Sequence, residues 1–262
     1  MHISSPWRHL PLVVLLVLGL SYAQADDFLF VGNSYTAGSA SAVLKHGGVP
    51  KMFEEIAKAK GKQVTTDAVI AGGKSWNFHL SQPITETKLV AKPWTWVVLQ
   101  DQSARLDKED GPFLTDGETF YERIVKASPS GKLALYETWA RPVAYFKGDA
   151  AAAAKMIKNV HEGYAKLQSA LAAKSQHNEV RVAPVGSAFW EVEGKSAMNL
   201  HASDQHHANE NGYYLAALVI YRTIYHESVI GAPSKFFNGA VTISDDDAKK
   251  LQAVAEAAVV VK

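Results

Sequence analysis

The 262-residue chain contains no cysteine and is close to electrically neutral, with 27 lysine and arginine residues against 26 aspartate and glutamate residues. A chain without cysteine forms no disulfide bond and no metal site with thiolate ligands. The balanced charge gives no electrostatic reason to expect nucleic acid or an anionic membrane as a partner.

The first 25 residues are typical of an export signal. A charged start is followed by the apolar run 10–20, and Ala23-Gln24-Ala25 has the small-x-small pattern of a signal-peptidase site. The apolar run is too short to span a bilayer comfortably, which favours a cleaved signal over a membrane anchor. We expect residues 1–25 to be removed and residues 26–262 to form one domain. The mature protein is then periplasmic or secreted from a bacterium, without stable insertion in the membrane.

Five short runs rich in β-branched and aromatic residues predict strands of a buried parallel sheet. Each run is bounded by polar or glycine-containing segments, as strands of such sheets are. The predicted strands are Phe28–Val31, Val64–Ile70, Trp96–Leu99, Leu133–Tyr136 and Val180–Val185.

Helical segments separate these strands. A proline near the start of the first segment and Gly61 after its end match the usual helix asymmetry, and five consecutive alanines support the third. Ser244, followed by three aspartates, resembles a helix cap that opens the last. The predicted helices are Pro50–Lys60, Asp116–Ala127, Asp149–Ser175, Glu210–Tyr225 and a final helix that ends near Ala258, with loops over 101–116 and 194–209.

The alternation of strands and helices predicts an α/β fold in which a parallel sheet of about five strands is covered on both faces. Ligands of such sheets collect at the carboxyl ends of the strands. Ser34, Gly72 and Gln102 follow the first, second and third predicted strands. Their loops should therefore open on the same edge of the sheet.

Three side chains suited to serine-type acyl hydrolysis lie near opposite ends of this domain. Ser34 stands on a turn after the first strand, and Asp204 and His207 stand just before the helix predicted at 210–225. A serine hydroxyl needs a histidine to accept its proton, and a carboxylate orients that histidine. Each residue type alone is common in turns and on surfaces, so the prediction depends on the combination. Ser34 is the expected nucleophile, with His207 and Asp204 as its partners.

The same chemistry needs hydrogen-bond donors for the oxyanion of the tetrahedral intermediate. The backbone N–H of Ser34 is one natural donor. Gly72, or the adjacent Gly73, could offer a second N–H with no side chain in the way. Gln102 could offer its side-chain amide. The sequence leaves open which of the two glycines takes this part.

These motifs resemble those of the SGNH (GDSL-like) hydrolase superfamily. The sequence around residue 102 is similar to that of a bacterial branch that carries Gln in place of Asn. Two positions depart from the usual pattern, because the family has Asp at position 33 and Asn at position 102. Four blocks can be placed in order: Gly32-Asn33-Ser34-Tyr35-Thr36, Gly72, Gln100-Asp101-Gln102, and Asp204-x-x-His207 with Asn209 and Gly212 behind it.

The resemblance implies a flavodoxin-like three-layer α/β/α fold with a central parallel sheet. It implies Ser34 as the nucleophile, His207 as the base and Asp204 as the residue that orients the base. It also implies an oxyanion hole built from Ser34, Gly72 and Gln102, and neither a metal nor an organic cofactor.

The same residues allow other functions to be considered. Gly73-Lys74-Ser75 lacks the further glycine that a phosphate-binding loop requires, and no Gly-x-Ser-x-Gly elbow indicates an α/β-hydrolase. A non-catalytic glycan-binding protein of the same fold remains an alternative. A metallohydrolase remains another, with candidate ligands His201, Asp204, His206 and His207.

We therefore expect an exported serine esterase that forms an acyl-enzyme intermediate. Its expected partner is a small-molecule or glycan ester, and short acyl groups on carbohydrate are the favoured substrates because export places the enzyme near such glycans.

Overall fold

The structure is a computed structural model that describes residues 25–106, 110–174, 178–196 and 198–258. Residues 1–24 of the predicted export signal lie outside the described residues. Within the described ranges, no helix is both long enough and apolar enough to cross a membrane.

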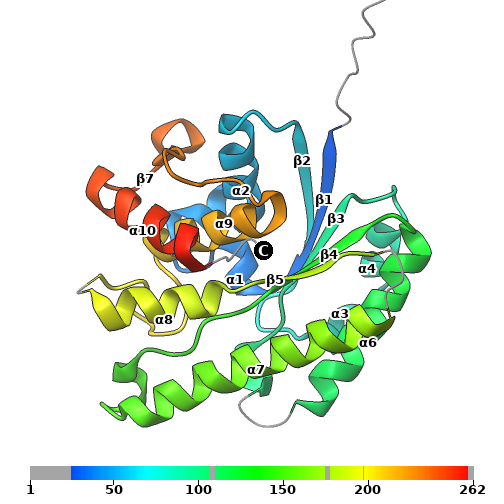
Figure 1. The fold of residues 1–262 in the computed structure, drawn as a ribbon, viewed down its shortest axis with the longest axis horizontal. Helices are drawn as coiled ribbons and strands as arrows, with labels where there is room; N and C mark the ends of the chain where they lie inside the picture. Colours follow the sequence, from blue (N-terminus) through cyan, green and yellow to red (C-terminus); the bar gives the residue numbers. More distant parts are fainter. Residues whose placement is uncertain (1–24, 107–109, 175–177, 197, 259–262) are drawn as a thin grey trace, which may run out of the picture.

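Five parallel strands form the central sheet in the order β2-β1-β3-β4-β5, as Figure 1 shows. Helices cover both faces, so the predicted three-layer α/β/α architecture is confirmed. The register sets the carboxyl ends of the first three strands level, because Gly32 pairs with Ile70 and Val31 pairs with Leu99. The strands are β1 (Asp26–Gly32), β2 (Val64–Ile70), β3 (Trp96–Leu99), β4 (Lys132–Tyr136) and β5 (Val180–Ala183).

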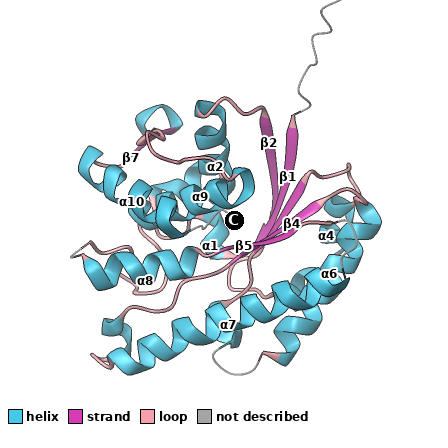
Figure 2. Cartoon of the chain, viewed as in Figure 1, coloured by secondary structure: helices cyan, strands magenta, loops and turns pink. Residues whose placement is uncertain are grey.

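Alternate residues of each strand face opposite helical layers. On β1, Phe28 and Phe30 belong to one buried cluster, and Leu29 and Val31 belong to the other. The first cluster is covered by α2 (Gly48–Ala59), α8 (Val185–Lys195), α9 (Glu210–Tyr225) and α10 (Asp245–Ala258). The second is covered by α3 (Trp76–Leu80), α4 (Pro83–Leu89), α6 (Gly111–Ala127) and α7 (Ala150–Lys174). Figure 2 shows the two helical layers on either side of the strands.

Short elements complete the chain between these layers. The helices α1 and α5 follow β1 and β3 and carry residues of the predicted site. A two-stranded antiparallel hairpin, formed by β6 and β7, precedes α10. The bounds are α1 (Ser34–Ala37), α5 (Ser103–Leu106), β6 (Lys235–Phe236), β7 (Val241–Thr242) and the 3₁₀ helices Ala42–His46, Val143–Phe146 and Phe237–Gly239.

The predicted strands and long helices are all present, and β2, β3 and α9 have the predicted bounds. Ser244 caps α10, because its Oγ accepts a hydrogen bond from Asp247 N at 3.1 Å. The fifth strand was predicted to reach Val185, which is wrong: it ends at Ala183, since Pro184 has no N–H to continue the ladder, and α8 begins instead. Helices α3 and α4 occupy a segment for which no helix was predicted.

Candidate active site

The turn that carries Ser34 is held by a glutamine from the neighbouring strand end. Gln100 Oε1 accepts hydrogen bonds from Asn33 N and from Thr36 Oγ1, both at 2.9 Å. Asn33 caps α1, because its side-chain oxygen accepts from Tyr35 N at 3.0 Å. Ser34 thereby occupies the first position of α1, where it is partly exposed while both of its chain neighbours are buried.

Asn33 stands where the resemblance implies Asp, and the structure gives the asparagine amide its own partner. Asn33 Nδ2 donates to the carbonyl oxygen of Lys74 at 3.2 Å. A carboxylate at this position has no proton to donate and would face that carbonyl with an acceptor. The amide therefore joins the β1–α1 turn to the loop after β2, which a charged aspartate could not do.

Gly32 ends β1 where no side chain fits. A Cβ built on Gly32 would lie 2.2 Å from Thr36 Oγ1 and 2.7 Å from Gln100 Oε1. Both atoms belong to the hydrogen bonds that hold the Ser34 turn.

Gly32→Ala is therefore expected to lower the free energy of unfolding by about 1–3 kcal/mol, the usual cost of overpacking. It should also lower ester hydrolysis by about 10-fold or more, because it displaces Ser34. Denaturant unfolding and initial rates measure the two effects. Gly72→Ala is the matched control, because a Cβ on Gly72 meets nothing within 4 Å. A tolerated Gly32→Ala would contradict this account of the turn.

The structure joins Asp204 and His207 by a hydrogen bond of 2.6 Å between Oδ2 and Nδ1. The other carboxylate oxygen of Asp204 accepts from the backbone N–H groups of His206 and His207, each at 2.9 Å. Partial burial opposes ionisation of Asp204, but the hydrogen bonds from His207 outweigh it and lower the pKa of this carboxyl. The pair therefore holds the His207 ring by Nδ1 and leaves Nε2 to act as a base.

His206 and Tyr35 connect this loop to the Ser34 turn. Tyr35 Oη lies 3.1 Å from His206 Nδ1, and the Tyr35 ring centroid lies 5.8 Å from that of His207. Tyr35 also stacks on the buried ring of Trp139 at 4.2 Å, and Trp139 Nε1 donates to the backbone oxygen of His206 at 3.2 Å. The turn that carries Ser34 and the loop that carries His207 meet through these aromatic contacts.

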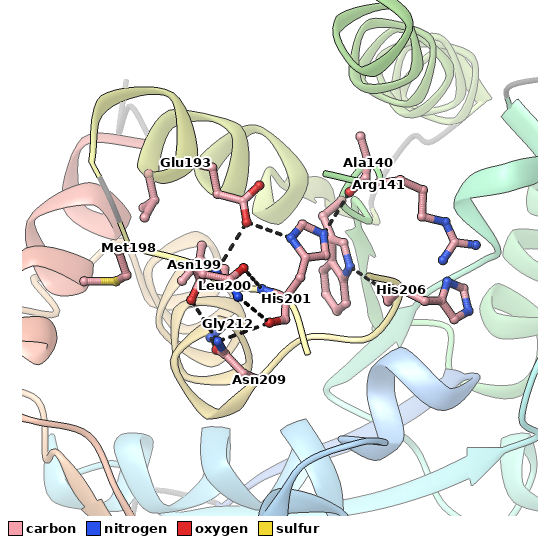
Figure 3. Close-up of polar contacts among 12 residues, drawn as sticks. Ala140, Arg141, Glu193, Met198, Asn199, Leu200, His201, His206, Asn209 and Gly212 are labelled. Atoms are coloured by element: carbon pink, nitrogen blue, oxygen red, sulfur yellow. Dashed lines mark hydrogen bonds and ion pairs between the residues drawn. The ribbon is translucent and has the colours of Figure 1, made fainter. Parts of the chain in front are cut away.

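His201 fixes the base of the same loop. Its Nδ1 lies 2.7 Å from Glu193 Oε1, and its Nε2 lies 3.1 Å from the backbone oxygen of Ala140. Figure 3 shows this network, in which Asn199 and Asn209 close the loop through further hydrogen bonds. His201 is buried, and these hydrogen bonds hold the loop in position.

The four candidate ligands of the metallohydrolase alternative do not form a common metal site in the described residues. Both ring nitrogens of His201 are occupied by protein oxygens, and His207 Nδ1 is occupied by Asp204. Across the described residues, no three His, Cys, Asp or Glu side chains form a group suited to a metal ion. The four predicted ligands are neighbours in sequence, but their side chains diverge into separate hydrogen-bonded pairs.

A cavity of about 40 Å³ lies at the edge of the sheet where the predicted loops meet. It brings together residues that follow β1, β2 and β3, so the expectation that these loops share one edge is confirmed. Gly73 lines it and Gly72 does not. A larger groove of about 500 Å³ between α8 and α10 contains none of the predicted site residues. The small cavity is lined by Asn33, Ser34, Tyr35, Gly73, Gln102, Ser103, Ala104, Arg141 and His206.

Candidate oxyanion donors line this cavity from the segments that follow β1, β2 and β3. The N–H of Ser34 opens α1, where no partner exists inside the helix. Gly73 has a φ of +68° in a turn closed by Lys74 N and the oxygen of Ala71, a conformation that favours glycine. Gln102 Nε2 donates to the backbone oxygen of Gly73. One of its two amide hydrogens is thus engaged, and the second remains for a ligand.

Asp101, between the two glutamines, is structural. It is fully buried, accepts from Trp76 N at 2.9 Å and pairs with Arg105. Burial raises the pKa of Asp101 to about 6, although Arg105 and the backbone donors oppose the rise. Through these bonds Asp101 ties α3 to α5 and fixes the loop that carries Gln102.

Ser34 and His207 are brought to the same region, but no hydrogen bond joins them. In the described part of the chain, Ser34 Oγ has no hydrogen-bond partner, whereas His207 is bonded to Asp204. Catalytic hydrogen bonds in enzymes without ligand are often long and tighten only when substrate binds. The assignment of roles to Ser34, His207, Asp204, Gly72 and Gln102 stays a prediction.

Comparison with known proteins places the fold. No protein-family profile and no curated protein match the chain. A DUF4886 family protein from Bacteroides uniformis superposes with a TM-score of 0.68 at 17% identity, over 90% of this chain and 95% of that one. An SGNH hydrolase candidate from Slackia heliotrinireducens superposes with a TM-score of 0.56 at 22% identity, over 77% of this chain and 100% of that one. The family 3 carbohydrate esterase of Clostridium thermocellum superposes with a TM-score of 0.57 at 14% identity, over 76% of this chain and 95% of that one.

The chain therefore has the three-layer α/β/α fold of the SGNH (GDSL-like) hydrolases, and the resemblance seen in the sequence motifs is confirmed for the fold. The cavity residues that sequence reasoning did not name as site residues include Tyr35, His206 and Arg141. Tyr35 was quoted only as part of the first block, His206 only as a candidate metal ligand, and Arg141 not at all. The histidine pair and the position of Tyr35 beside Ser34 were signals for the first two, whereas nothing local marks Arg141.

Proposed function

We propose that this protein is an exported serine esterase that cleaves short acyl esters through an acyl-enzyme intermediate. The observation that carries the proposal is the 2.6 Å bond between His207 Nδ1 and Asp204 Oδ2, on a loop that contacts the turn bearing Ser34 through Tyr35. A carboxylate that orients an imidazole beside a partly exposed serine is the arrangement that activates a hydroxyl nucleophile.

In the proposed reaction, Ser34 Oγ attacks the ester carbonyl carbon while His207 Nε2 accepts the hydroxyl proton. The carbonyl electron pair moves to oxygen, and the N–H groups of Ser34 and Gly73, with the amide of Gln102, stabilise the charge. Gly73 takes the place first given to Gly72, because Gly73 lines the cavity. The intermediate then expels the alcohol, which takes the proton from His207. Water, deprotonated by His207, releases the acid and restores Ser34.

The cavity volume favours a short acyl group. About 40 Å³ beside Ser34 accommodates a few heavy atoms and leaves a longer acyl chain outside. The structurally similar proteins include a carbohydrate esterase from Clostridium thermocellum and a lipase from a goat rumen metagenome. We favour ester cleavage on carbohydrate, with acylated glycans as substrates, because the cavity that the described residues form next to Ser34 is too small for a long lipid chain.

Covalent labelling tests the proposal. The purified chain is expected to release p-nitrophenol from p-nitrophenyl acetate and to lose that activity after reaction with an aryl fluorophosphonate. Peptide mass spectrometry should then find the phosphonyl group on the peptide that contains Ser34. Turnover without labelling, or a label on another serine, would overturn the assignment. Binding of acetylated glycans without any turnover would favour the glycan-binding alternative.

Export has a separate test. If residues 1–25 are a cleaved signal, the protein recovered from the periplasm or the medium of an expressing bacterium should begin at Asp26. N-terminal sequencing gives this result directly. Recovery of the intact chain in the cytoplasmic fraction would contradict the export proposal and leave the esterase proposal standing.

A further inference from the structure

Arg141 lines the cavity beside Ser34 without a carboxylate partner in the part of the chain that the structure describes. The other arginines of that part each lie within 4.0 Å of a carboxylate. A guanidinium that opens on a cavity and is not neutralised by the protein has the chemistry of a ligand-binding group. The paired arginines are Arg105, Arg123, Arg181 and Arg222.

The backbone and the ring beneath it hold Arg141 in place. The preceding residue, Ala140, accepts a hydrogen bond from His201, and Arg141 N donates to Met156 Sδ at 3.5 Å. The guanidinium lies 5.2 Å from the ring centroid of Tyr145, a cation–π distance. Figure 3 shows the side chains of Arg141 and His206 extending in the same direction. No hydrogen bond from the guanidinium to another described residue is present, so its N–H groups remain for a ligand.

The surrounding charges leave this positive group available. Asp204 is close enough for Arg141 to contribute to the lowering of its pKa, but the Asp204 carboxylate is already bonded to His207. Lys74, next to the cavity residue Gly73, adds a second positive charge, since its ammonium lies over the Phe78 ring at 5.1 Å and pairs with no acid of the described segments. The rim of the Ser34 cavity is thus more positive than the nearly neutral chain as a whole.

We propose that Arg141 binds a carboxylate on the alcohol part of the ester, so that the preferred substrates are short acyl esters of acidic sugars or of other carboxylate-bearing alcohols. The inference rests on the proposed esterase function. The alcohol part is favoured because a cavity of about 40 Å³ has no room for a charged acyl chain. A planar carboxylate matches the two parallel N–H groups of a guanidinium, which makes Arg141 a specificity-determining residue.

Matched pairs of esters test the proposal. The 2-, 3- and 4-acetoxybenzoates carry a carboxylate at three distances from the same acetyl ester, and their methyl esters are neutral. We expect Arg141→Gln to lower kcat/KM by about 10- to 100-fold for at least one anionic isomer, mainly through KM, because a charged hydrogen-bonded pair is lost. The neutral partner should change by less than about threefold. Arg141→Lys should recover part of the loss, since it keeps the charge without the planar fork.

Lys147→Gln is the control, because it removes the same charge from an exposed position on the same segment, outside the cavity. Equal losses for anionic and neutral esters would mean that Arg141 acts on the oxyanion, and no loss for either would mean that it contacts no substrate. Each result overturns the proposal. Preference for mono-p-nitrophenyl succinate alone would move the carboxylate to the acyl part and overturn the stated assignment.

A binding measurement separates this inference from the esterase proposal. Calorimetry of the Ser34→Ala variant with 4-acetoxybenzoate reports binding without turnover. We expect the addition of Arg141→Gln to raise Kd by about 10-fold or more. Arg141-dependent binding by a chain that hydrolyses no ester would refute the esterase and retain the recognition of the carboxylate. Hydrolysis with no dependence on Arg141 would retain the esterase proposal and refute the recognition of the carboxylate.

Discussion

Replacement of Ser34 by alanine is expected to lower kcat/KM for p-nitrophenyl acetate by at least about 10³-fold. In a serine hydrolase the hydroxyl forms the covalent bond, and the losses on its removal are of this order or larger because nucleophile and base act as a unit. The residual rate comes from the oxyanion donors and from binding, which the substitution leaves in place. Initial rates of p-nitrophenol release, together with thermal unfolding of the variant, measure the effect.

Ser103 supplies the matched control for this prediction. It lines the same cavity and is buried, so Ser103→Ala removes a hydroxyl of the same kind from the same place. Its hydrolysis rate should stay within about 10-fold of that of the unmodified chain. If Ser103→Ala abolished hydrolysis while Ser34→Ala preserved it, Ser103 after β3 would be the nucleophile in place of Ser34 after β1, and the proposed mechanism would be wrong.

Local sequence patterns were sufficient to predict the sheet. The strands are short apolar runs, and a run such as Trp96–Leu99 is buried on both faces, which leaves few alternatives to a central parallel strand. The order of the motifs then placed Ser34, Gly72 and Gln102 after strands whose ends are level, and the structure shows that Gly73, next to Gly72, lines the shared cavity. The failure at Val185 has the same origin, because the apolar run continues past the proline that ends the ladder.

Contacts between distant segments could not be predicted in this way. Trp139 is fully buried between the rings of Tyr35 and Phe189, which lie on different elements, and no spacing rule relates the three positions. The same holds for Gln102, whose amide meets the oxygen of Gly73 across 29 residues. Arg141 is distinguished because it forms no ion pair with the described residues, which only the folded chain reveals.

The His-His pair shows both the strength and the limit of sequence reasoning. The spacing of Asp204 and His207 allowed both to project from one loop, and the structure joins their side chains by a hydrogen bond. It did not indicate that His206 would be the histidine that lines the cavity and meets Tyr35. The structure therefore offers two imidazoles near Ser34, and only one of them has a carboxylate to orient it.

His207→Ala is expected to lower kcat for p-nitrophenyl acetate by about 10²- to 10⁴-fold, the contribution of a general base. His206→Ala, which removes the adjacent ring, is the matched control and should lower kcat by less than about 10-fold. The partner of His206 is the neutral Tyr35 Oη, which gives the ring no negative charge to orient it as a base. Asp204→Asn should lower kcat about as much as His207→Ala does, because an amide can stabilise the wrong tautomer of the His207 ring.

Added imidazole distinguishes a lost base from a disordered loop. It should restore part of the activity of His207→Ala, because the free base can enter the space vacated by the ring, and it should not restore Asp204→Asn, where the His207 ring still fills that space. If His206→Ala showed the larger loss and imidazole rescued that variant instead, His206 would be the base and the bond between Asp204 and His207 would serve only to shape the loop.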